Sequence, residues 1–234
     1  MSISGGSLFL LFAAAGVAPV AVVLGHRGSR GLSVPGLRWV KTTVPVLLLL
    51  AVGTAPAFLS GSPPLSLVLI AAGMAATVLA DWFLAPADNS STFAAGLATF
   101  LIGYFLYGAA FLVRALSDGD GSPVVFGCYL AAALAGWLQW RRLLAVPQSL
   151  KGAVVAYVAV ASHLLAAGVA QALLDPTPAS FFMAAAALMI YGSDSLIAHN
   201  LFRRRLPAEE LWILPPYYLG QLAVAVGILS SVGF

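Results

Sequence analysis

The chain has 234 residues, of which 8 % are charged and 61 % are hydrophobic. Soluble domains carry about 25 % charged residues, so this composition excludes an ordinary water-soluble domain and indicates a protein of the lipid bilayer. The formal net charge of +3 raises nucleic acid as a partner. The cations lie in short clusters between long apolar runs, however, and this distribution argues against nucleic acid as a partner. The one cysteine, Cys128, excludes an intramolecular disulfide and a cysteine-based zinc cluster.

Eight segments are long and apolar enough to cross a membrane, since a transmembrane helix needs about 20 mainly apolar residues. In chain order they are Ser7–Gly25, Val40–Leu59, Leu65–Leu84, Thr92–Val113, Val124–Trp140, Gly152–Leu174, Ala179–Phe202 and Leu211–Gly233. The first segment lacks the basic start of a signal peptide and is too long for one, so it is interpreted as a span. We therefore predict an all-α fold: a polytopic membrane helical bundle of eight transmembrane helices, forming a single domain over residues 1–234.

The cations are distributed unevenly among the connections between these segments. One side of the predicted bundle holds Arg27, Arg30, Arg38, Lys41, Arg141, Arg142, Lys151, Arg203, Arg204 and Arg205, whereas the other holds Arg114. The positive-inside rule then places both termini on the non-cytoplasmic side. Binding of anionic lipid or of a substrate headgroup is the alternative role for these clusters. The composition, rich in Ala, Gly and Leu, indicates a bacterial source, and hence a bacterial plasma membrane.

Two carboxyls lie inside the predicted spans, where each charge costs at least about 2.5 to 3.5 kcal/mol on insertion scales. Asp81 lies near the cytoplasmic end of the third span, and Asp194 lies somewhat deeper in the seventh. Counted along the helices, their depths differ by less than about 10 Å, so we expect both to face one cavity. The alternatives are structural: Asp194 hydrogen-bonded to a neighbouring helix, and Asp81 in contact with interfacial water.

Further polar side chains lie in a similar or slightly deeper layer. They are Lys41, Tyr104, Tyr107, Tyr191, Tyr217 and Gln221. Tyr191 precedes Asp194 by three residues and so shares its helix face. Together these residues predict a polar pocket that opens toward the inner leaflet. The three histidines, His26, His163 and His199, lack the spacing of metal ligands, and no nucleotide-binding motif is present, so we expect neither a metal nor a cofactor.

Several short motifs resemble those of a known family. The run from Phe93 to Leu101, the pair Ala80-Asp81, the triplet Ser193-Asp194-Ser195, and Tyr217 with Gln221 are similar to the YhhN-type lysoplasmalogenases. That family consists of eight-span proteins of about this length. The resemblance implies hydrolysis of the vinyl ether bond of a lysoplasmalogen, which releases a fatty aldehyde and a glycerophospho-base. It also implies that Asp81 and Asp194 occupy the acidic positions of the family and Lys41 its basic one.

The chain departs from this pattern at two positions. It has Ala80 where the family usually has Gly, and Tyr104 where the family usually has a histidine three residues before Tyr107. Loss of that imidazole removes a candidate proton shuttle.

A chemical mechanism can be written for the two carboxyls. Desolvation favours the protonated form of a carboxyl, so the deeper Asp194 is expected to be the acid that protonates an electron-rich double bond. Asp81 would stabilise the cation or orient water, the tyrosines would shape the pocket, and Lys41 would contact the headgroup phosphate. Two other functions fit the same residues. The first alternative is a membrane-integral terpene cyclase that acts on an isoprenoid through the same protonation. The second is a lipid-binding or transport protein. The sequence leaves the oligomeric state open.

Overall fold

The structure is a computed structural model that describes residues 5–29, 37–55, 61–84, 90–117, 121–143 and 146–233. Its described residues form α-helices and one short 3-10 helix, with no β-strand among them. The helices are α1 (Gly5–Ser29), α2 (Leu37–Gly53), α4 (Leu65–Leu84), α5 (Ser90–Ala115), α6 (Ser122–Arg142), α7 (Lys151–Leu174), α8 (Pro178–Phe202) and α9 (Glu209–Gly233), with the 3-10 turn η1 (Gln148–Leu150) before α7. The predicted all-helical class is confirmed.

The helices agree with the predicted spans to within a few residues. Seven of them are long and apolar enough to cross a membrane, so the chain is a multi-pass membrane protein. The eighth, α2, is shorter, with an apolar part at Trp39–Gly53. The predicted second span continued to Leu59, and its last residues lie outside the described part of the chain. The count of eight spans and the sides of the membrane stay predictions.

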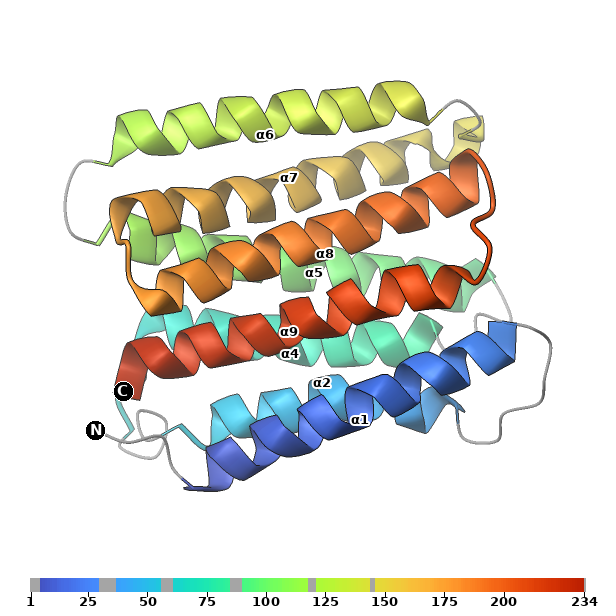
Figure 1. Cartoon of the computed structure of the whole chain (residues 1–234). Coiled ribbons are helices and arrows are strands. Elements are labelled where there is room, and N and C mark those ends of the chain that lie inside the picture. Colours follow the sequence, from blue (N-terminus) through green and yellow to red (C-terminus); the bar gives the residue numbers. More distant parts are fainter. Residues whose placement is uncertain are drawn as a thin grey trace.

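The helices pack in an order that differs from their order along the chain. α5 packs against α4 and α7, and α9 packs against α8, α1 and α2. α6 lies at one edge of the bundle, where it packs against α7 (Figure 1). This arrangement brings α4, α5, α7, α8 and α9 around one central region. Residues far apart in sequence therefore meet there.

Small residues allow the close approach of α4 and α5. A Cβ atom at Gly73 would lie 2.7 Å from the ring of Tyr107 and 3.0 Å from the carbonyl oxygen of Gly103. A Cβ at Gly103 would in turn lie 3.0 Å from the carbonyl oxygen of Gly73. Such small-residue contacts are typical of helix pairs in membranes. They fix the position of the Tyr107 ring of α5 against α4.

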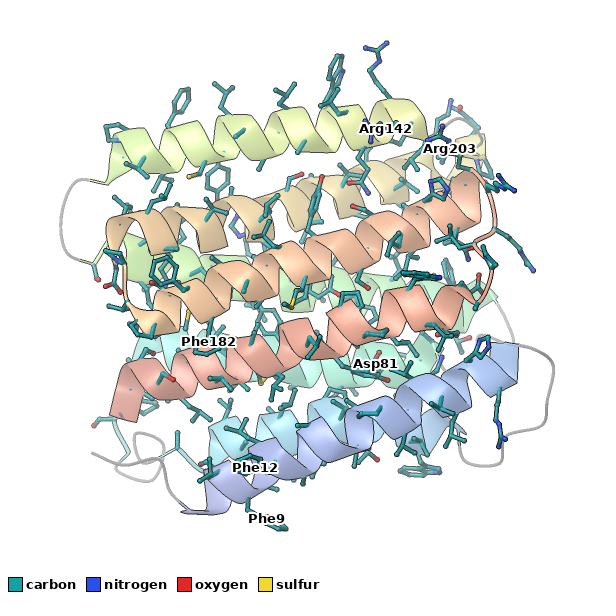
Figure 2. The ribbon with its side chains drawn as sticks, viewed as in Figure 1. Phe9, Phe12, Asp81, Arg142, Phe182 and Arg203 are labelled. Atoms are coloured by element: carbon teal, nitrogen blue, oxygen red, sulfur yellow. The ribbon has the colours of Figure 1, made fainter. Side chains whose placement is uncertain are left out.

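The two ends of the bundle differ in charge. Arg27, Lys41, Arg141, Lys151 and Arg203 lie at or next to the helix ends of one side, together with their basic neighbours. Figure 2 shows Arg142 and Arg203 at that end, which we call the basic end. Arg30 lies outside the described residues. The start of α1 and the end of α9 lie at the opposite end (Figure 1), as the predicted topology requires of the two termini.

Candidate functional site

A cavity of about 290 Å³ lies inside the bundle near its basic end. Its wall is built from α2, α4, α5, α7, α8 and α9. Both Asp81 and Asp194 line it, and Figure 2 shows Asp81 in the half of the bundle that ends at Arg142 and Arg203. Two carboxyls separated by more than a hundred residues therefore share one cavity.

Asp81 is held by a phenol from the last helix. The Tyr217 hydroxyl donates a hydrogen bond of 2.7 Å to Oδ2 of Asp81. The ring of Phe100 meets that of Tyr217 edge-on, with 5.8 Å between the ring centroids. Asp81 itself is only partly buried. This carboxyl thus has a fixed orientation and some access to the opening of the cavity.

Asp194 is more enclosed, with a relative exposure of 2 %. Its Oδ2 atom is buried and has no hydrogen-bond partner. Its carboxyl interacts with the phenols of Tyr157 on α7 and Tyr104 on α5. Buried polar atoms are nearly always hydrogen-bonded, so an unpartnered oxygen on a cavity wall marks a position where a ligand atom fits.

The neighbouring Ser193 fixes the helix that carries Asp194. Its hydroxyl donates a hydrogen bond of 2.9 Å to the backbone carbonyl of Ile213 on α9. The side chain of Ser193 is fully buried. This bond ties α8 to α9 beside the cavity, so the two helices that carry Asp194 and Tyr217 keep a fixed relative position.

Charged side chains surround the basic end of the cavity. Nζ of Lys41 forms an ion pair of 3.2 Å with Oε1 of Glu210, and each side chain is 20 % exposed. The Tyr218 hydroxyl donates to the backbone carbonyl of Lys41 at 3.3 Å. Glu209 accepts a hydrogen bond from the amide of Asn200. The cavity lining therefore contains one cation and four carboxyls, two of which hold this end in place.

The structure brings together five of the eight predicted site residues. Lys41, Asp81, Tyr104, Asp194 and Tyr217 line the cavity. The other three, Tyr107, Tyr191 and Gln221, are not among its lining residues. Each of them lies farther from the basic end than the lining residue of its own helix, because a shift of three or four residues moves a side chain by about 5 Å along the axis.

These three residues have other surroundings. The Tyr107 hydroxyl donates a hydrogen bond of 2.8 Å to Oε1 of Gln221, and both side chains are buried. The Tyr191 hydroxyl is buried without a partner, and the Tyr191 backbone carbonyl accepts from the Ser195 hydroxyl at 2.8 Å. The Tyr107–Gln221 pair joins α5 to α9 directly behind the cavity.

Sequence reasoning missed several lining residues, among them Tyr157, Glu209, Glu210 and Tyr218. Tyr157 lies at the same helical depth as the predicted residues, so the count along the spans could have found it. The two glutamates precede the predicted eighth span, which begins at Leu211. In the structure they form the first turn of α9, with the side chains facing the cavity.

Comparison with known proteins identifies the family to which the chain belongs. The model of the YhhN family matches residues 37–228. The chain belongs to the YhhN family. The match runs from the first residue of α2 into α9 and so includes every helix that lines the cavity, whereas α1 precedes it. No curated protein and no solved structure matches the chain.

Proposed function

We propose that this YhhN protein hydrolyses the vinyl ether bond of a lysoplasmalogen by acid catalysis within the membrane. The observation that carries the proposal is the pair Asp81 and Asp194 on the wall of one cavity. The two carboxyls have unlike surroundings, since Asp81 accepts from Tyr217 and one oxygen of Asp194 has no partner. Unlike environments are what separates the acid from the base in a pair of catalytic carboxyls.

The first step is a proton transfer. Asp194, as the neutral acid, gives its proton to the vinyl carbon that is not bonded to oxygen. The electron pair of the double bond forms the new C–H bond, and the ether oxygen stabilises the resulting oxocarbenium ion. The Oδ2 atom of Asp194 supports this role, because it lies on the cavity wall without a hydrogen-bond partner among the described residues and is free to face a substrate carbon.

Water then completes the reaction. A water molecule next to Asp81 adds to the carbon bonded to oxygen and loses its proton to the Asp81 carboxylate, which gives a hemiacetal. The hemiacetal returns its hydroxyl proton to Asp194 as the C–O bond to glycerol breaks, and Asp81 protonates the leaving glycerol oxygen. One water is consumed, a fatty aldehyde and a glycerophospho-base are released, and both aspartates recover their starting forms.

The charges of the cavity favour a zwitterionic headgroup. Lys41 is the cation available to a phosphate, and Glu209 and Glu210 line the same end. A phosphate would bind to Lys41, and a headgroup amine would bind to the glutamates. Among the described lining residues a diphosphate would meet one cation and several carboxylates, so like-charge repulsion disfavours it.

Aromatic side chains support the cyclase alternative. The ring of Phe100 lies 5.5 Å from Tyr104 and 5.8 Å from Tyr217, measured between centroids. Aromatic faces stabilise cations, and a carbocation formed from an isoprenoid would need such walls. The charged basic end argues for the hydrolase, because a cyclase must exclude water from its cation.

The test uses purified protein in detergent or vesicles and a lysoplasmalogen, with released aldehyde as the readout. We expect turnover by the unaltered protein and a loss of at least about 100-fold in Asp194→Asn, since general acid catalysis contributes about 100- to 10,000-fold. The variant should unfold at the temperature of the parent. Absence of aldehyde at every pH, with isomers formed from a polyprenyl substrate instead, would establish the cyclase.

A further inference from the structure

A second cavity, of about 490 Å³, lies between α6 and α7. α6 contributes side chains between Tyr129 and Trp140, and α7 contributes side chains between Val155 and His163. We call this space the α6–α7 groove. Because α6 lies at the edge of the bundle (Figure 1), the groove adjoins the lipid-facing side of the protein.

One residue belongs to the walls of both spaces. Val158 lines the carboxyl cavity and also the α6–α7 groove. Its chain neighbour Tyr157 lines the carboxyl cavity and interacts with Asp194. Successive helical residues point about 100° apart, so Val158 lies where the cavity-facing side of α7 meets its groove-facing side. Val158 is therefore the residue that the described walls of the two spaces share, next to Tyr157 at the level of the proposed acid.

The carboxyl cavity is small for the proposed substrate. Its 290 Å³ is at the lower limit of the roughly 300 to 1,000 Å³ found for pockets that hold drug-sized ligands. A lysolipid with a long aliphatic chain is larger, and its headgroup would already occupy the end near Lys41 and Glu210. The chain must therefore extend beyond the cavity, on the side of the double bond away from the headgroup.

The groove is suited to an aliphatic chain. The Tyr129 hydroxyl and Nδ1 of His163 are hydrogen-bonded to each other at 2.6 Å, so these two groups are already paired. The His163 ring stacks on Phe105, with 5.2 Å between centroids. The other walls are mainly aromatic rings and small or branched apolar side chains. Ser162 also lines the groove, and its buried Oγ, like Nε2 of His163, has no hydrogen-bond partner among the described residues.

We propose that the aliphatic chain of the substrate passes Val158 and lies in the α6–α7 groove, so that Val158 determines which chain lengths are accepted. This inference rests on the proposed function, since it takes the position of the reacting double bond from Asp194. It assigns a role to α6, which otherwise contributes nothing to the carboxyl cavity.

The experiment compares a chain of about 16 carbons with one of about 6, in the parent protein and in Val158→Trp. We expect the indole to lower kcat/KM by about tenfold or more for the long chain and by less than about twofold for the short one. Ala156→Trp is the matched control, because Ala156 is exposed on the same helix and lines neither space. It should leave both substrates unaffected.

Binding is measured in parallel with saturated ether analogues of both lengths, which cannot be hydrolysed. If the parent hydrolyses neither substrate but Val158→Trp weakens the long analogue alone, the proposed function fails and the chain path holds. If Val158→Trp affects both lengths equally, or neither, the chain path is wrong even where hydrolysis is observed. If the parent binds neither analogue, the chain path is wrong as well.

Discussion

The Tyr217 hydroxyl on α9 donates a 2.7 Å hydrogen bond to the Asp81 carboxylate on α4. We expect Tyr217→Phe to lower kcat by about 10- to 150-fold, because hydrogen bonds to charged groups are worth about 1.5 to 3 kcal/mol. Turnover of a lysoplasmalogen measures this. Tyr107→Phe is the comparison, because the Tyr107 hydroxyl bonds Gln221 behind the cavity. Loss of that hydroxyl should lower the unfolding temperature and leave kcat nearly unchanged. Equal effects of both variants on kcat would contradict the proposed role of Asp81.

Replacement of Lys41 by Met should raise KM and leave kcat nearly unchanged, because the ammonium would contact the headgroup and not the reacting bond. The effect on stability should be small, since a partly exposed ion pair contributes about 0.2 to 1 kcal/mol. Steady-state kinetics together with thermal unfolding separates the two effects. A fall in kcat at constant KM would mean that Lys41 acts on the chemical step.

The ion pair of Lys41 with Glu210 also competes with a phosphate for the same ammonium. Glu210→Gln should therefore lower KM for a substrate whose headgroup has a phosphate but no amine, such as a glycerophosphate lipid. The same variant should raise KM for a zwitterionic headgroup, because the amine loses a carboxylate partner. A change of the same sign for both headgroups would exclude this role of Glu210.

Removal of the Ser193 hydroxyl should destabilise the contact between α8 and α9. Ser193→Ala loses the 2.9 Å bond to the Ile213 carbonyl and should cost about 0.5 to 1.5 kcal/mol. Thermal unfolding in detergent measures this loss. Ser231→Ala is a suitable reference, because its hydroxyl bonds only the carbonyl of Ile228 within the same helix and should have a smaller effect.

The close approach of α4 and α5 gives a packing prediction. Gly73→Ala should destabilise the protein by about 1 to 3 kcal/mol, since its Cβ would lie 2.7 Å from the Tyr107 ring. Gly16→Ala in α1 is the matched control, with no atom within 4 Å of its Cβ position. It should be neutral or slightly stabilising, because alanine favours the helix. The ratio of folded to aggregated protein after heating provides the measurement.

Much of this structure could be predicted from the sequence, and the limits have physical causes. Apolar runs of about 20 residues identify transmembrane helices independently of their neighbours. Isolated carboxyls such as Asp81 and Asp194 can be identified as candidate functional residues, because a charge inside the membrane has a high free-energy cost. Which helices pack against each other could not be predicted in this way. That α5 packs against α7 and α9 against α1 depends on side-chain fit along whole helices, which residue counts do not report.

The same cause explains the errors within the site. The spacing of three residues places Tyr191 and Asp194 at similar angles on α8, but Tyr191 lies about 5 Å deeper and is not among the lining residues of the cavity. Glu210 was not among the predicted site residues, because it precedes the predicted eighth span, which begins at Leu211. A charged first turn is instead part of α9, with its carboxyl satisfied by Lys41.

The first helix precedes the residues that the family model matches, yet it contacts the basic end of the cavity. A Cβ atom at Gly25 of α1 would lie 2.9 Å from Cδ1 of Leu214 and 3.2 Å from Cε of Lys41. The bare backbone at this position leaves room for the lysine stem to reach Glu210. A substitution on α1 at this position would therefore shift Lys41 sterically, although α1 contributes no residue to the described lining of the cavity.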